Sequence, residues 1–211
     1  MIVFLTQGCT KKNKSDEGHN LLYEAFRLED ELKLEQAQRL YKGIAAKYTK
    51  INLNEHDALE IDMYGYNSGN IKTYAEWAQY RLPFVECKIN DMNKRSFKNK
   101  EELKSKIIDL ITKNQTAELS QTLWCEVFIG PCQSEFGILT PDAATTYLID
   151  EKTKQTHLLY NNEKNLVFSG FKEGFYSFRL SPIKDRWTLR DIVYCDPKFA
   201  KDNPEFQADK K

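Results

Sequence analysis

The strongest constraint on the fold is a change in hydrophobic periodicity along the chain. Up to residue 82, apolar residues recur at three- and four-residue intervals, the spacing of amphipathic helices. Beyond residue 144, short aromatic and β-branched runs are separated by turn residues, which is typical of strands in hairpins. Helices that precede such strands favour the α+β class. We predict an N-terminal helical part, followed by a helix packed on a C-terminal antiparallel sheet.

Four helices are expected in the first half. Two have apolar stripes that begin at Leu21 and Leu34, and a short third helix starts after Asn54. The fourth is expected to end near Leu82, because Pro83 disfavours a helical conformation in the residue before it.

A polar, basic stretch at residues 88–100 is the expected domain boundary, and Asn99 at its end is a candidate N-cap for the next helix. The expected parts are a signal remnant and tether (1–16), a helical region (17–86), an α+β domain (96–200) and a flexible tail (201–211).

The second half is expected to contain a short helix at 118–123 and then a meander of strands. Residues 124–136, with Trp124 and Phe136 near their ends, are interpreted as a connection through a Gly-Pro turn or as a binding loop. The predicted strands cover residues 145–150, 156–160, 166–168, 176–180, 187–189 and 192–195.

Near the N-terminus, the run Leu5-Thr6-Gln7-Gly8-Cys9 precedes a polar stretch. It resembles the lipobox of bacterial lipoproteins, although Thr6 and Gln7 depart from the usual residues. The resemblance implies a lipid such as palmitate on Cys9 and a leader that begins upstream. The alternative is a short strand or disordered end with an incidental Gly-Cys pair.

Apart from Cys9, the chain has four cysteines, an even number that an oxidising compartment favours. Of the three pairings, we prefer Cys125–Cys132 with Cys87–Cys195. The alternative is four reduced, buried thiols. Zinc is disfavoured, because the chain has no Cys-x-x-Cys pair and no histidine near a cysteine.

Charge and motifs argue against several functions. Lys+Arg and Asp+Glu both number 31, which disfavours a nucleic-acid surface. The chain has no nucleophile elbow, phosphate loop or His-Glu-x-x-His motif, so we expect no catalytic residue, metal or cofactor. We interpret His19 as solvated and His157 as a sheet-face residue. The acidic residues around His56 are interpreted as favourable to a helix dipole, and the alternative is a surface metal site formed by His56 with Glu60 one helical turn away.

Two further resemblances concern separate segments. Residues 25–48, with Ala37 and Tyr41 in the second helix, resemble one tetratricopeptide helical pair, which implies partner binding. Residues 185–197 resemble the closing hairpin of small secreted α+β domains, some with a nuclear-transport-factor-like fold.

The leading functional hypothesis is a lipid-anchored cell-envelope protein, at the periplasmic or outer-membrane face, that binds a protein partner without catalysis. The first alternative is a small envelope enzyme or ligand carrier, and the second is a cytoplasmic tetratricopeptide-like adaptor. The candidate ligand-binding residues on a sheet face and its adjoining loop are Trp124, Phe136, Tyr147, Tyr160, Phe178 and Trp187.

Overall fold

The computed structural model describes residues 14–63, 71–132, 137–203 and 206, so Cys9 and Phe136 lie outside the described residues. The chain forms two compact units. We refer to Met1–Leu59 with Gly69–Leu82 as the helical unit, and to Glu60–Ser68 with Pro83–Lys211 as the sheet unit.

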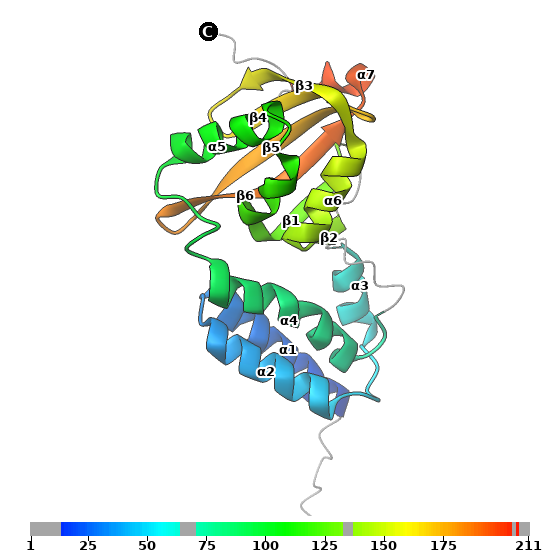
Figure 1. The fold of residues 1–211 in the computed structure, drawn as a ribbon. Helices are drawn as coiled ribbons and strands as arrows, with labels where there is room; N and C mark the ends of the chain where they lie inside the picture. Colours follow the sequence, from blue (N-terminus) through cyan, green and yellow to red (C-terminus); the bar gives the residue numbers. More distant parts are fainter. Residues whose placement is uncertain (1–13, 64–70, 133–136, 204–205, 207–211) are drawn as a thin grey trace, which may run out of the picture. The chain divides into compact units, whose positions relative to one another are not determined.

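The helical unit begins with the expected helical hairpin. Helix α1 (Lys14–Asp30) and helix α2 (Leu34–Lys47) pack side by side in opposite directions (Figure 1). Leu32, in the turn between them, has a positive φ of 56°. Their facing stripes supply buried apolar side chains to the core, which include Leu22, Ala25, Leu28, Ala37, Tyr41 and Ile44.

Helix α3 (Glu55–Met63) begins after Asn54, as predicted, but helix α4 (Tyr74–Asp91) does not end at Leu82. Pro83 lies inside α4 and cannot donate a backbone hydrogen bond. The helix continues because Phe84 and Val85 are buried in its next turn, and this packing outweighs the local preference of proline. The division between the two units falls at Pro83.

The sheet unit confirms the α+β prediction. Its six strands form one curled, mostly antiparallel mixed sheet in the order β2-β1-β6-β5-β4-β3, and only β1 and β6 are parallel. Helices α5 and α6 lie over one face (Figure 1), where the main core forms. The elements are α5 (Lys100–Thr112), the 3-10 helix η2 (Thr116–Gln121), β1 (Leu123–Pro131), β2 (Gly137–Leu139), α6 (Pro141–Glu151), β3 (Lys152–Asn161), β4 (Asn165–Phe171), β5 (Gly174–Ile183), β6 (Arg186–Cys195) and α7 (Pro197–Ala200).

Two predicted elements in this unit are wrong. Residues 145–150 belong to α6 and not to a strand, because Thr140 caps the helix and Pro141 occupies its first turn. Residues 124–131 are not a connection, since they form most of β1, which is bonded on both sides to other strands. Asn99 caps α5 as predicted, accepting a hydrogen bond from the backbone N–H of Glu101.

Candidate functional site

All four cysteines in the described residues form disulfides. The bonds are Cys87–Cys125 and Cys132–Cys195, with Cα–Cα distances of 5.6 and 5.2 Å. The pairing preferred from the sequence, Cys125–Cys132 with Cys87–Cys195, is therefore wrong. Cys125 and Cys132 are seven positions apart along extended chain, which corresponds to about 23 Å. Cys132 instead meets Cys195, because the parallel register of β1 and β6 ends with Pro131 opposite Tyr194.

These disulfides indicate a protein that folds in an oxidising compartment outside the cytoplasm. None of the helices in the described part of the chain is long and apolar enough to cross a membrane.

A buried ion pair adjoins the first disulfide. Lys88 Nζ lies 3.1 Å from Glu126 Oε2, and these side chains are 9% and 6% exposed. Arg190 also approaches this carboxylate, at 3.9 Å, and its guanidinium lies over the ring of Phe128. Because the buried carboxylate lies between Lys88 of α4 and the partly exposed Arg190 of β6, this cluster is a structural cross-link between α4, β1 and β6.

The structure separates the predicted ligand-binding residues. Phe178 is fully buried in the main core, and Tyr147 and Trp187 pack against that core half-buried. Tyr160 packs against a different cluster, which contains Val167 and Cys195. Trp124 is buried in β1.

Tyr147 belongs to a polar-aromatic cluster beneath α6. Its hydroxyl lies 3.2 Å from that of Tyr176, which stacks between Phe171 and Tyr194. Burial raises the pKa values of Tyr147 and Tyr176 above the ordinary range, so both remain hydrogen-bond donors. The buried Oε2 of Glu151, one helical turn after Tyr147, has no hydrogen-bond partner among the described residues. Such convergent polar groups on an apolar face can orient a small ligand.

A second polar cluster lies in the helical unit. Asp57 of α3 is 1% exposed, and its two carboxylate oxygens have different partners. Nδ1 of His19 lies 2.7 Å from Oδ1, and the Tyr74 hydroxyl donates to Oδ2 at 2.6 Å. His19 is thus not the solvated residue that we expected, since its side chain is 32% exposed and bonded to Asp57.

Two residues near the cluster, Asn54 and Gly18, position the Asp57 carboxylate and its partner Tyr74. Asn54 accepts a hydrogen bond from the backbone N–H of Asp57 at 2.7 Å and so caps the start of α3. Gly18 allows the Tyr74 ring to lie against α1, because a Cβ at Gly18 would come within 2.8 Å of that ring. Burial and the bond to Asp57 raise the pKa of Tyr74 to about 12, so its hydroxyl donates at neutral pH.

The two histidines beside Asp57 differ in how they contact its carboxylate. An ionised carboxylate only accepts, so His19 donates from Nδ1, and in the neutral ring Nε2 carries a lone pair. His56 approaches the same oxygen, with its Nδ1 3.8 Å from Asp57 Oδ1, and is 69% exposed. No group of three or more His, Cys, Asp or Glu side chains within the described residues is placed to hold a metal ion.

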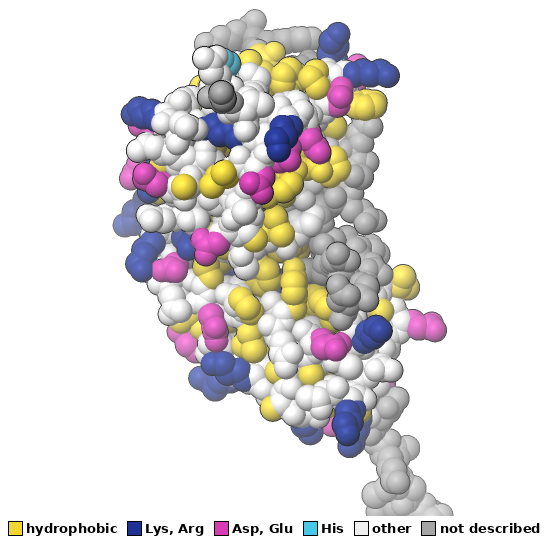
Figure 2. Space-filling view, turned by 45° about the vertical axis from the view of Figure 1, so that its right-hand side comes forward, with side chains coloured by type: hydrophobic (Ala, Val, Ile, Leu, Met, Phe, Trp, Pro, Cys, Tyr) yellow, Lys and Arg dark blue, Asp and Glu magenta, His cyan; other side chains and the backbone are white. Residues whose placement is uncertain are grey.

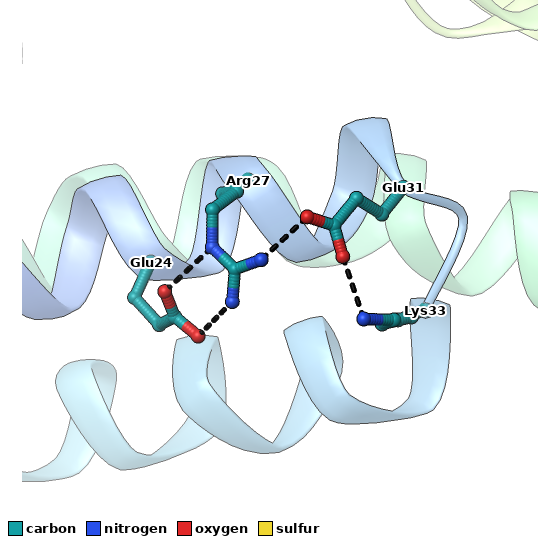
Figure 3. A network of polar contacts seen from close by, with 4 residues as sticks. All are labelled: Glu24, Arg27, Glu31 and Lys33. Carbon is teal, nitrogen blue, oxygen red and sulfur yellow. Dashed lines mark hydrogen bonds and ion pairs between the residues drawn. The ribbon is translucent and has the colours of Figure 1, made fainter.

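Other charged networks of the helical unit are structural. Arg81 donates to Glu29 at 2.5 Å, and Tyr41 donates to the other oxygen of the same buried carboxylate. On the surface, Arg27 bridges Glu24 and Glu31, and Lys33 continues this network into the start of α2 (Figure 3). Exposed ion pairs of this kind contribute little to stability.

No protein-family model matches the chain, and no curated protein matches its sequence. Two crystal structures of DUF4783 family proteins are similar to part of it. The protein from Bacteroides fragilis YCH46 is 11% identical with a TM-score of 0.35, over 43% of this chain and 94% of its own. The protein from Bacteroides ovatus ATCC 8483 is 12% identical with a TM-score of 0.34, over 43% of this chain and 91% of its own. Similarity at this level assigns no function.

Proposed function

We propose that the chain is an exported cell-envelope lipoprotein that binds a protein partner and catalyses no reaction. The observation that carries the proposal is the pair of disulfides in the sheet unit, because stable disulfides belong to compartments outside the cytoplasm. In the lipobox-like run Leu5–Cys9, Cys9 is the residue that carries the lipid. Helix α1 begins at Lys14, five positions after Cys9, so this tether would hold the helical unit close to the bilayer.

The residue after the lipidated cysteine determines in which membrane a bacterial lipoprotein is retained. Thr10 stands where Asp would retain a lipoprotein in the inner membrane, so in a two-membrane bacterium we place the protein at the outer membrane.

Charge supports a protein partner. The formal net charge is zero, and on the face in Figure 2 basic and acidic side chains are interspersed. The described residues on this face therefore form no stripe of basic charge for a phosphate backbone.

Metabolic labelling with a palmitate analogue tests the anchor in cells that express the chain with its natural upstream sequence. Labelled protein should appear in the membrane fraction, and Cys9→Ala should abolish both the label and the membrane association. Val3→Ala is the matched control, because it changes the same run without removing the thiol. An unlabelled wild-type chain, or label that survives Cys9→Ala, would contradict the lipid anchor.

A cross-linking experiment tests the partner. Intact cells are treated with a membrane-permeant amine cross-linker, and the chain is then analysed for a defined heavier adduct. A discrete adduct of the wild-type chain that weakens in Cys9→Ala would support an envelope partner. A chain that stays entirely monomeric would argue against partner binding.

A second function, ligand carriage, is favoured by the cluster beneath α6. Buried tyrosine hydroxyls there accompany a carboxylate oxygen of Glu151 without a hydrogen-bond partner among the described residues. A small polar molecule with a hydrogen-bond donor would complete this arrangement. Native mass spectrometry of the protein purified from its own cells tests this function. A bound mass that is lost in Glu151→Gln would support ligand carriage, and a bare chain would argue against it.

A further inference from the structure

The Asp57 cluster has the arrangement that supports a metal ligand. In metal sites, a ligating histidine commonly donates its second ring N–H to a carboxylate, which fixes the ring and raises its basicity. Here Nδ1 of His19 lies 2.7 Å from the buried Oδ1 of Asp57. The hydroxyl of Tyr74, at 2.6 Å from Oδ2, holds that carboxylate in turn. The ring nitrogen that remains for an ion is Nε2 of His19.

This nitrogen is available. His19 has its described contacts through Nδ1 and through its ring face, which lies 4.4 Å from the Tyr23 ring. Its side chain is 32% exposed, so an ion in solution can reach it. A ring that is already oriented loses little freedom when it binds, which favours affinity.

A second imidazole lies beside the first. The ring centroids of His19 and His56 are 6.4 Å apart, with the rings nearly perpendicular. Metal–nitrogen bonds to histidine are about 2.0–2.1 Å long, so two rings that share one tetrahedral ion have centroids about 5 Å apart, and His56 must move towards His19 to share it. His56 is 69% exposed and can rotate towards the ion.

We propose that His19 and His56 bind one divalent transition-metal ion between α1 and α3. Asp57 acts as the outer carboxylate that orients His19, and water completes the coordination. Imidazole ligands suit Zn²⁺, Cu²⁺ and Ni²⁺, and among these the general order of affinity places Cu²⁺ highest. The proposal does not rest on the proposed function in the envelope, because it is argued from the contacts of His19, His56 and Asp57 alone.

Zn²⁺ alone, titrated calorimetrically into the full chain with Cys9→Ser, tests the proposal. That substitution removes the one cysteine outside the two disulfides, which would otherwise bind zinc. One ion should bind per chain, and His19→Ala and His56→Ala should each weaken binding at least about tenfold. Asp57→Asn should weaken it about 10–100-fold, as loss of an outer carboxylate does.

The third histidine is the matched control. His157 is exposed in β3 of the sheet unit, and His157→Ala should bind zinc like the parent chain. Nitrogen NMR of the imidazole rings gives a second readout, in which zinc should perturb Nε2 of His19 and leave its Nδ1–H in place. If His19→Ala fails to fold, zinc binding by His56→Ala tests the proposal, because the His56 side chain is exposed. No saturable binding, or unchanged binding in His56→Ala, would overturn the proposal.

Discussion

Lys88 and Glu126 form a buried ion pair directly beside the disulfide that joins the residues before them, Cys87 and Cys125. Helix α4 and strand β1 are thus joined twice at adjacent positions, once covalently and once by charge. This double cross-link holds the last turns of α4 to the sheet.

The Cys87–Cys125 disulfide should provide a large share of the sheet unit's stability. It closes a loop between residues 38 positions apart, and a native disulfide of this size contributes about 2–4 kcal/mol. We expect the double variant Cys87→Ala/Cys125→Ala to lose about this much free energy of unfolding in urea. A loss below about 0.5 kcal/mol would contradict a structural role.

The effects on stability of substituting Lys88 and Glu126, the ion pair beside this disulfide, should be strongly coupled. Lys88→Met removes the cation that lies 3.1 Å from the buried Glu126 carboxylate, so we expect a loss of about 3–5 kcal/mol. Lys88→Met/Glu126→Leu removes both charges and should recover much of that loss. A double-mutant cycle in urea measures the coupling, and additive effects would show that the two charges do not interact.

The fold shows which sequence patterns are reliable. The helical stripes of α1 and α2 predict both helices correctly, because each helix buries one face. The alternation at residues 176–180 predicts β5 correctly, although Ser177 on its polar face is buried as well. Strand β1 lacks that alternation, because consecutive residues on both of its faces are buried and it reads as a nearly continuous apolar run. The β-branched residues Thr145, Thr146 and Ile149 resembled a strand, but the Thr140-Pro141 helix start overrode their propensity.

The candidate sites were harder to predict, because their residues are far apart in sequence. His19 and Asp57 are separated by 38 positions, and the partner of each cysteine lies on a different element. The one local signal was Asn54 before Asp57, which predicts the start of α3. It gives no indication that His19 lies opposite.

Two helix glycines provide a matched pair that tests the packing behind Asp57. A Cβ at Gly18 would lie 2.8 Å from Tyr74 Cδ2, whereas a Cβ at Gly43 meets nothing within 4 Å. Gly18→Ala should destabilise the helical unit by about 1–3 kcal/mol through overpacking. Gly43→Ala should stabilise it by about 0.5–1 kcal/mol, because alanine favours a helix. Thermal unfolding of both variants measures the difference, and equal shifts would refute the close packing.

Asp191 of β6 should make stability depend on pH. Burial raises the pKa of its carboxyl from the ordinary 3.8, although Arg190 and the Ser181 hydroxyl partly oppose this. Between the unfolded and the folded pKa the native state binds more protons, so this group's contribution to stability falls as pH rises through that window. Asp191→Asn cannot ionise and should therefore be more stable than the parent at neutral pH.

The advantage of Asp191→Asn should shrink as the pH falls below the ordinary pKa of 3.8, where the parent side chain is protonated in both states. Asp185→Asn, in the exposed turn between β5 and β6, serves as the control and should leave stability nearly unchanged. The urea concentration at the midpoint of unfolding, measured for the parent and both variants over this pH range, gives the difference in stability. An advantage that persists unchanged at low pH would show that burial of charge at Asp191 is not its cause.

This chain folds outside the cytoplasm and forms two particular disulfides. Mass-spectrometric peptide mapping of protein taken from its own cells, alkylated at once and digested without reductant, tests it most directly. We expect linked peptides that join Cys87 to Cys125 and Cys132 to Cys195. Alkylated, unpaired thiols at these four positions would contradict it.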